Sequence, residues 1–420
     1  MKFIHAADVH LDSPLKGLER YEGAPVEEIR SATRRAFDNL VELAVEEGVA
    51  FVLLAGDLYD GDWKDYNTGL YFVDRMRQLE VANILVFIVA GNHDAASQIT
   101  KQLRLPDNVT LFATNKPQTV VLEELGVAIH GQGFAKRAVT EDMSLAYPQG
   151  DSHLFNIGLL HTCLDGKPGH EPYAPCSVDG LRTKGYKYWA LGHVHTREIV
   201  SEEPWIVFPG NIQGRHIREI GPKGCTLVTV ENGEVEVLEH RDLDVLRWVR
   251  CTVDVSSSDT VDEIYALVRD ALEQALDEAD SLPVAARLVL QGSSLAHDEL
   301  HAESVHWVQE YRALATGLGG AGMWLEKVSL ETTPIFAVDD LLERDDALAG
   351  LLQVIQALEV DSAGVERLAE EVASLRQKLP AELLSGEYGY DPSDNEHLSN
   401  LMGDIKVLLT RRLLTTGGSS

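Results

Sequence analysis

Cysteines, basic residues and long apolar runs are all scarce in this sequence of 420 residues. Its four cysteines are far apart and form no Cys-x-x-Cys pair, which excludes the usual thiolate zinc and redox motifs. No apolar run is long enough to cross a bilayer. The sequence opens on a strand-like segment without the features of a secretory signal. We therefore expect a cytoplasmic protein with reduced thiols and no membrane partner.

Positive charge is also in short supply. Lysine and arginine total 36 against 67 aspartates and glutamates, so the formal net charge is -31. A protein that coats DNA by charge alone is ordinarily basic, because duplex DNA is a dense line of negative charge. Two ways of binding a nucleic acid remain: through metal ions and a local basic patch, or through a partner subunit. Alternatively, the acidic excess serves only solubility.

The length favours more than one domain. In roughly the first 200 residues, short β-branched runs alternate with amphipathic segments, which is typical of an α/β fold. We expect strands at 51–55 and 84–89 and helices at 29–47 and 71–79. Asn232-Gly233 lies between two strand-like segments and predicts a hairpin. This hairpin would close a first domain, residues 1–245.

A second unit is predicted to begin near residue 246. Three segments alternate between strand and helix patterns and predict a small α/β capping domain over residues 246–333; they are 248–255, 261–276 and 287–290. The pattern over 334–414 is helical, and residues 415–420 resemble a flexible tail. An apolar stripe within the helical region either packs inside the protein or docks a partner helix; it consists of Val365, Leu368, Val372, Leu375 and Leu379.

Five apolar runs each end in residues that can bind a metal ion. They deliver Asp8 and His10, then Asp57, then Asn92, then His161, and finally His193 and His195. Ligands of open α/β sheets bind beyond the carboxyl ends of the strands, so we expect these side chains to converge. Oxygen and nitrogen donors without thiolate favour manganese, iron or similar ions. The set suits two metal ions that share one carboxylate.

Residues next to these ligands are candidates for other roles. His93 follows a metal-binding asparagine and is free to protonate a leaving oxygen or to stabilise developing charge. Asp94 is expected to orient His93. His5 and His130 lie within apolar strands, and we interpret them as buried, hydrogen-bonded histidines. Four basic residues are possible DNA contacts, although solvated surface charge explains them nearly as well: Lys101, Arg104, Arg215 and Arg218.

The ordered series of motifs resembles that of the calcineurin-like metallophosphoesterases. The segments 3–14 and 209–215 are similar to the SbcD class of DNA double-strand-break nucleases, particularly its YhaO-like branch, and the match covers about the first 240 residues. The resemblance implies an α/β sandwich of layered mixed β-sheets flanked by helices. In this sequence, a small α/β capping domain and a helical C-terminal extension would follow the sandwich.

The same resemblance implies two divalent metal ions per chain, with manganese expected and His93 as the catalytic histidine. One ion would be held by Asp8, His10, Asp57 and His195, and the other by Asp57, Asn92, His161 and His193.

The family further implies a nuclease of DNA repair. The expected activity is manganese-dependent 3′ to 5′ exonuclease action on duplex ends and endonuclease action on single strands. The expected assembly is a homodimer, formed through helices 29–47 and 71–79, that works with an SbcC-like coiled-coil ATPase. Two alternatives stay open, because metal motifs alone do not select a substrate. One is a phosphoesterase for nucleotides, small molecules or phosphoproteins, and the other is a DNA-end-binding scaffold with weak catalysis.

Overall fold

The computed structural model describes residues 1–13, 25–60, 66–96, 104–164, 174–335 and 347–356, with Asp394, Leu398, Ile405 and Leu409. The chain divides into two units, Met1–Pro334 and Ile335–Ser420. In the second unit, helix α9 spans Ala347–Gln356. The predicted stripe at 365–379, the predicted tail at 415–420 and Lys101 lie outside the described residues. No helix in the described part of the chain is long and apolar enough to span a membrane.

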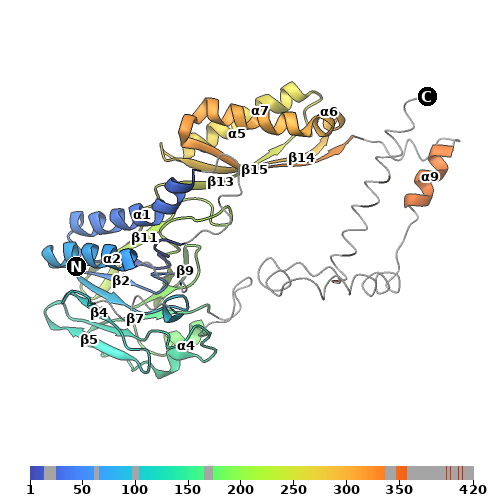
Figure 1. Ribbon diagram of the computed structural model, residues 1–420. Helices are drawn as coiled ribbons and strands as arrows, with labels where there is room; N and C mark the ends of the chain where they lie inside the picture. The colour runs from blue at the N-terminus through green and yellow to red at the C-terminus, as the bar shows by residue number, and fades with distance from the viewer. Residues whose placement is uncertain are drawn as a thin grey trace. The chain divides into compact units, whose positions relative to one another are not determined.

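Six strands form the first sheet, in the order β12-β11-β1-β2-β3-β4 (Figure 1). They are β1 (Lys2–Ala6), β2 (Phe51–Leu54), β3 (Leu85–Ile88), β4 (Val109–Leu111), β11 (Gly224–Glu231) and β12 (Glu234–Asp242). Strands β1 to β4 run parallel, and β11 joins β1 antiparallel. The predicted hairpin is confirmed: β11 and β12 pair antiparallel around Asn232 and Gly233, whose φ angles of 52° and 78° suit a two-residue turn.

The second sheet has the order β5-β6-β7-β8-β10-β9. Its strands are β5 (Gln118–Leu122), β6 (Val127–Gly131), β7 (Phe155–His161), β8 (Tyr188–Gly192), β9 (Glu198–Glu202) and β10 (Trp205–Phe208). Strands β6, β7, β8 and β10 run parallel to their neighbours, whereas β5 and β9 are antiparallel edge strands. Both sheets are therefore mixed, which confirms the predicted fold of layered mixed β-sheets flanked by helices.

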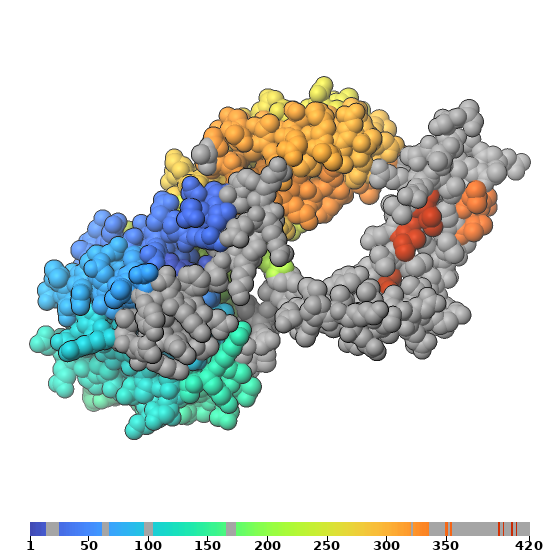
Figure 2. Space-filling view, in the orientation of Figure 1, coloured from blue at the N-terminus to red at the C-terminus, as the bar shows by residue number. Residues whose placement is uncertain are grey.

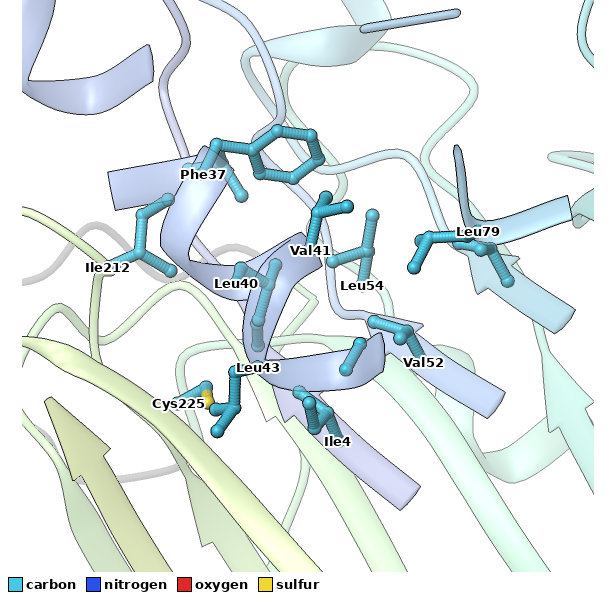
Figure 3. Close-up of a cluster of buried hydrophobic side chains, with 14 of the residues drawn as sticks. Ile4, Phe37, Leu40, Val41, Leu43, Val52, Leu54, Leu79, Ile212 and Cys225 are labelled. Atoms are coloured by element: carbon cyan, nitrogen blue, oxygen red, sulfur yellow. The ribbon is translucent and has the colours of Figure 1, made fainter. Parts of the chain in front are cut away.

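Alternate residues of the central strands face different layers. In β2, Val52 and Leu54 pack against helices α1 (Val26–Glu46) and α2 (Tyr66–Val81), as Figure 3 shows. Phe51 and Leu53 instead join the core between the two sheets. The outer face of the second sheet is covered by a third apolar cluster near α4 (Val178–Arg182). The continuous apolar runs in the sequence thus reflect strands that are buried on both faces.

The capping domain is a separate three-stranded sheet with helices on one face. Its elements are β13 (Arg247–Asp254), α5 (Val261–Glu278), β14 (Val284–Ser294), α6 (His297–Ala302), α7 (Ser304–Gly319) and β15 (Met323–Pro334). All three strands are parallel, in the order β13-β14-β15. The sequence predicted β13, α5 and part of β14 but missed α6, α7 and β15. In Figure 2 the capping domain, from β13 to β15, forms the yellow and orange lobe.

Candidate metal centre

The predicted ligands all lie at or just beyond strand ends. Asp8 and His10 follow β1, Asp57 follows β2, and Asn92 follows β3. In the second sheet, His161 ends β7, and His193 and His195 follow β8. The loops after β1 and β2 stay paired, because the His10 amide donates to the Asp57 carbonyl at 2.9 Å. The structure thus brings all seven side chains to one edge of the two sheets.

The backbone at this edge adopts conformations that L-residues rarely take. The φ angles are 51° at Asp8, 47° at His10, 52° at Asp57 and 103° at His193. Each such residue costs on the order of 1–3 kcal/mol and persists only where the surrounding contacts hold it. Here the Asp8 carboxylate accepts the His193 amide at 3.0 and 3.1 Å. Strain gathered on four expected ligands is typical of a functional site.

One cluster of donor atoms consists of Asp8, His10 and His195. The Nε2 atoms of the two histidines lie 3.3 Å apart, and His195 Nε2 lies 3.8 Å from Asp8 Oδ1. The other nitrogens face carboxylates: His10 Nδ1 is 2.8 Å from Asp60, and His195 Nδ1 is 2.7 Å from Glu219. When each Nδ1–H donates to its carboxylate, both Nε2 atoms present lone pairs to each other. Such lone pairs fit a metal ion between them.

The second cluster consists of Asp57, His161 and His193, with Asn92 beside it. His161 Nδ1 donates to the Ala55 carbonyl at 2.9 Å, which leaves Nε2 as an acceptor. This Nε2 lies 2.9 Å from Asn92 Oδ1 and 3.5 Å from Asp57 Oδ2. Three acceptor atoms thus meet at one point, an arrangement that a cation stabilises.

Asp57 connects the two clusters. Its Oδ2 lies 3.5 Å from His161 Nε2 and 4.0 Å from His10 Nε2, so one carboxylate faces both groups. Position 91 must be glycine, because a Cβ there would lie 2.2 Å from Asp57 Oδ1. The geometry therefore suits Asp57 as the shared ligand.

The two buried carboxylates have opposite pKa shifts. Burial, with the charge of Asp57 added, raises the pKa of Asp8. Burial acts on Asp57 in the same sense, but the imidazoles of His161, His10 and His93 outweigh it and lower the pKa to about 2. The negative charges of Asp8 and Asp57 repel each other, so having both carboxylates ionised is unfavourable without nearby positive charge. A divalent ion supplies that charge. The donor set therefore fits two divalent metal ions. When bound, such ions polarise phosphoryl oxygens and lower the pKa of bound water.

The residue that holds His93 differs from the prediction. His93 Nδ1 lies 3.1 Å from Asp60 Oδ1, and its amide donates to Asp57 Oδ1 at 2.9 Å. Asp94 instead accepts the amides of Tyr59 and Gly91, each at 3.0 Å. Asp94 thus positions the loop backbone, and the prediction that it orients His93 was wrong. Burial and the charge of Asp57 raise the pKa of Asp94 to about 7.

Burial alone would lower the pKa of His93, but the hydrogen bond to Asp60 and the charges of Asp57 and Asp60 raise it. The imidazole of His93 is 34% exposed, against 25% for His195, 1% for His10 and 0% for His161. With Nδ1 directed at Asp60, Nε2 is the nitrogen left for a substrate. His93 is therefore suited to donate a proton to a reacting group.

The basic candidates occupy different environments. Arg215 is mostly buried in the site, 3.1 Å from Glu219 and 3.8 Å from Asp60, and Glu219 raises its pKa against the effect of burial. Arg104 and Arg218 are exposed side chains outside both donor clusters. Lys101 lies outside the described residues.

Sequence reasoning missed two carboxylates, Asp60 and Glu219. Asp60 follows Asp57 by three residues and was open to detection as part of a Gly-Asp-x-x-Asp pattern. Glu219 lies 24 residues after His195 and has no local signal that ties it to the site.

Two histidines left out of the ligand set are indeed buried and hydrogen-bonded. His5 contacts the Tyr188 hydroxyl at 3.0 Å and the Leu191 carbonyl at 3.1 Å. His130 contacts the Thr119 hydroxyl at 2.8 Å and Asn156 at 3.2 Å. Neither lies in a metal-ligand group of the described residues.

Comparison with known families agrees with this class of site. Residues 1–197 match the family model described as calcineurin-like phosphoesterase, and residues 248–333 match that of the metallophosphoesterase YhaO middle domain. The uncharacterized metallophosphoesterase YhaO of Bacillus subtilis is 36% identical over 70% of this chain and 72% of its own length.

More distant relatives include proteins named DNA double-strand break repair protein Mre11. That of Sulfurisphaera tokodaii is 23% identical over 72% of this chain and 76% of its own. That of Aeropyrum pernix is 27% identical over 66% and 68%, respectively. A solved dimetal phosphatase from Danio rerio aligns with 58% of this chain and 96% of its own at 12% identity and a TM-score of 0.35, and that likeness carries no part of the assignment.

The fold and the donor clusters define a metallophosphoesterase with candidate ligands for divalent metal ions. The chain belongs to the calcineurin-like metallophosphoesterase family.

Proposed function

We propose that this metallophosphoesterase is a nuclease of DNA repair that hydrolyses DNA phosphodiester bonds with two manganese ions. The observation that carries the proposal is the pair of donor clusters around Asp57 with His93 beside them. This arrangement suits in-line displacement at a phosphorus atom. The distant relatives named for double-strand break repair favour DNA as the substrate. The proposed polarity on duplex ends is 3′ to 5′, with endonuclease action on single strands.

The side chains around the donor clusters have distinct tasks in this reaction. Asp60 holds Nδ1 of His93, so that Nε2 can protonate the leaving oxygen. Arg215 places a fixed positive charge at the site, 3.8 Å from Asp60, where it can stabilise negative charge on the phosphoryl group. Glu219 holds His195 in one tautomer, and Asp60 does the same for His10.

Digestion of end-labelled linear duplex, single-stranded and circular DNA tests the proposal. The full chain with manganese should shorten the duplex from its 3′ ends. A chelator and a His93→Ala variant should each abolish the cleavage. The matched control is His153→Ala, which removes an exposed histidine that belongs to neither donor cluster.

Two other outcomes would support the alternatives. Intact DNA with rapid hydrolysis of nucleotides or phosphopeptides would identify a phosphoesterase for smaller substrates, which the same metal ligands can serve. Tight binding of DNA ends, with cleavage no faster in the wild type than in His93→Ala, would indicate a scaffold.

A homodimer formed through α1 and α2 is part of the proposal. A groove of about 610 Å³ lies between these helices and is lined by Val41, Val45, Val81 and Ala82 among others. Val45 is 46% exposed and Val81 is 85% exposed. A second copy would bury this apolar surface. Light scattering should give the mass of a dimer, and Val81→Lys should shift it to a monomer, whereas a monomeric wild type would refute the dimer.

We also propose an SbcC-like coiled-coil ATPase as the partner of the dimer. The strongly acidic balance of the chain favours a partner that supplies part of the DNA affinity. Co-purification of the full chain with the candidate ATPase, followed by cleavage assays with and without ATP, would test this pairing. Equal cleavage rates with and without the ATPase would argue against it.

A further inference from the structure

The capping sheet carries a row of three basic residues across its three strands. Arg250 on β13 pairs in register with Arg287 on β14, and Arg287 pairs with Lys327 on β15. Residues in register point to the same face, and neighbouring strands lie about 4.8 Å apart. In a chain with nearly twice as many acidic as basic residues, three adjacent cations stand out from the composition.

This row lies on the face of the sheet opposite to the helices. Cys251 and Val253 of β13, with Leu288 of β14, pack into the apolar cluster under α5 and α7. Side chains alternate along a strand, so Arg250 and Arg287 point the other way. Figure 1 shows α5 and α7 on one side of β13 to β15. On the other side, α1 packs through Ile29 against Trp248 and Trp324. Arg250 and Lys327 are exposed.

The like charges in this row are only partly compensated. A bulge between Ala286 and Arg287 sets both Glu326 and Lys327 opposite Arg287. Glu326 binds Arg287 through two hydrogen bonds, of 2.7 and 2.8 Å. Among the described residues, neither Arg250 nor Lys327 forms an ion pair. Like charges directly opposite one another destabilise a sheet, so the row costs stability that a bound anion would offset.

The neighbours of the row suit an extended polyanion. Two residues further along each strand lie Thr252, Val289 and Ser329. The hydroxyl groups of Thr252 and Ser329, on the two outer strands, can donate to phosphate oxygens. The acidic side chains of this face, Asp254 and Glu331, are two residues further still, about 13 Å from the row. The basic row is thus bordered by two hydroxyl groups and one apolar side chain before the first acidic residues of the face.

On its other side, the row adjoins the loop that serves the metal centre. Trp248 and Trp324 lie on the same face as the row and pack with Ile29 and Ile217. Trp248 Nε1 donates to the Gly214 carbonyl at 3.1 Å. The segment between Gly214 and Ile217 also contains Arg215. Trp248 is two residues before Arg250, a rise of about 7 Å.

We propose that Arg250, Arg287 and Lys327 form a binding surface for the phosphate backbone of the DNA substrate, beside the cap's contact with the Arg215 loop. This inference rests on the proposed nuclease function and adds where the substrate is held. It places the basic patch in the capping domain. Through such a local patch, a chain that is acidic overall can still bind DNA.

The test is the salt dependence of DNA binding by the full chain, measured by fluorescence anisotropy with a chelator that keeps the DNA intact. The test variant is Arg250→Gln with Lys327→Gln; Arg287 stays, so that Glu326 keeps its partner. Loss of two phosphate contacts should reduce the slope of log K against log salt by about 1.8. The fall in affinity between about 50 and about 200 mM salt should then be roughly tenfold smaller.

The matched control is Lys116→Gln with Arg269→Gln, which removes two exposed cations from other surfaces. It should keep the wild-type slope, and an equal loss in both double variants would reduce the effect to net charge and overturn the inference. The test variant should unfold at the same or a higher urea concentration than the wild type, because it removes like-charge repulsion.

Two further results separate the possible failures. An unchanged slope in the test variant, with DNA cleavage by the wild type intact, would overturn this surface but leave the nuclease proposal standing. Absence of both binding and cleavage in the wild type would overturn both proposals. Polyglutamate serves as a probe for an acidic protein ligand. If the test variant binds polyglutamate more weakly but binds DNA as the wild type does, the row binds an acidic protein and the inference is overturned.

Discussion

The Nε2 atoms of His10 and His195 face each other across 3.3 Å, and a different carboxylate lies at the Nδ1 atom of each ring. Two imidazoles held in this way direct lone pairs at the same point, which is the arrangement of carboxylate–histidine–metal sites. The carboxylates Asp60 and Glu219 are therefore part of the metal centre, although neither belongs to the predicted ligand set.

Replacing Glu219 should weaken metal binding without removing a predicted ligand. Glu219→Gln keeps an oxygen near His195 Nδ1 but loses the charge that makes the imidazole a better donor. Supporting carboxylates of this kind contribute about 10-fold to 100-fold in metal affinity. Calorimetric titration with manganese alone should show the loss at one of two sites. Affinity equal to that of the wild type would exclude a role for Glu219 in metal binding.

Gly91→Ala should disturb the shared carboxylate. The new Cβ would lie 2.2 Å from Asp57 Oδ1, so that side chain must move. We expect manganese affinity to fall tenfold or more, since Asp57 faces both donor clusters. The control is Gly317→Ala in the last turn of α7, where no atom lies within 4 Å of the new Cβ. That variant should gain about 0.5–1 kcal/mol in stability and keep its metal affinity.

Acid should destabilise the protein through His5. Burial lowers its pKa from 6.5 to about 3. The unfolded state then binds a proton more readily between these values, so the stability that His5 contributes is complete above about pH 6.5 and declines as the pH falls toward 3. The slope from this group is at most about 1.4 kcal/mol per pH unit.

Urea unfolding of the metal-free protein at several pH values measures this effect. His5→Gln can still donate to the Leu191 carbonyl and does not titrate, so its unfolding free energy should depend less steeply on pH. The same pH dependence in both proteins would show that other groups cause the acid sensitivity.

Arg247 should matter for stability far more than exposed arginines do. It makes hydrogen bonds of 2.9 and 3.0 Å to Asp244, whose side chain has no exposed surface. Arg247→Met would leave that carboxylate buried without its partner, at a cost of about 3–5 kcal/mol in unfolding free energy. Arg182→Met breaks a pair whose side chains are 48% and 91% exposed, and should change stability by less than about 0.5 kcal/mol. Similar losses in both variants would refute this account.

The sequence by itself determined the strands and the ligands that follow them. The apolar runs around Phe51 and Leu85 predicted β2 and β3 because strands covered on both faces are apolar throughout. Asp8, Asp57 and His161 were open to prediction for a related reason: each polar residue ends such a run, and that signal is local in the chain. Asn232-Gly233 predicted its hairpin equally well, since few residue pairs accept two left-handed conformations.

Only the tertiary structure decided which groups support those ligands. Asp60 rather than Asp94 contacts His93, because the loop after β2 folds toward the site while the Asp94 oxygens are used by backbone amides. Glu219 reaches His195 from a separate loop, and Arg250, Arg287 and Lys327 become neighbours only when three strands pair in register. A sequence pattern records the period of one element, whereas these contacts depend on how distant elements pack, and no local period encodes that packing.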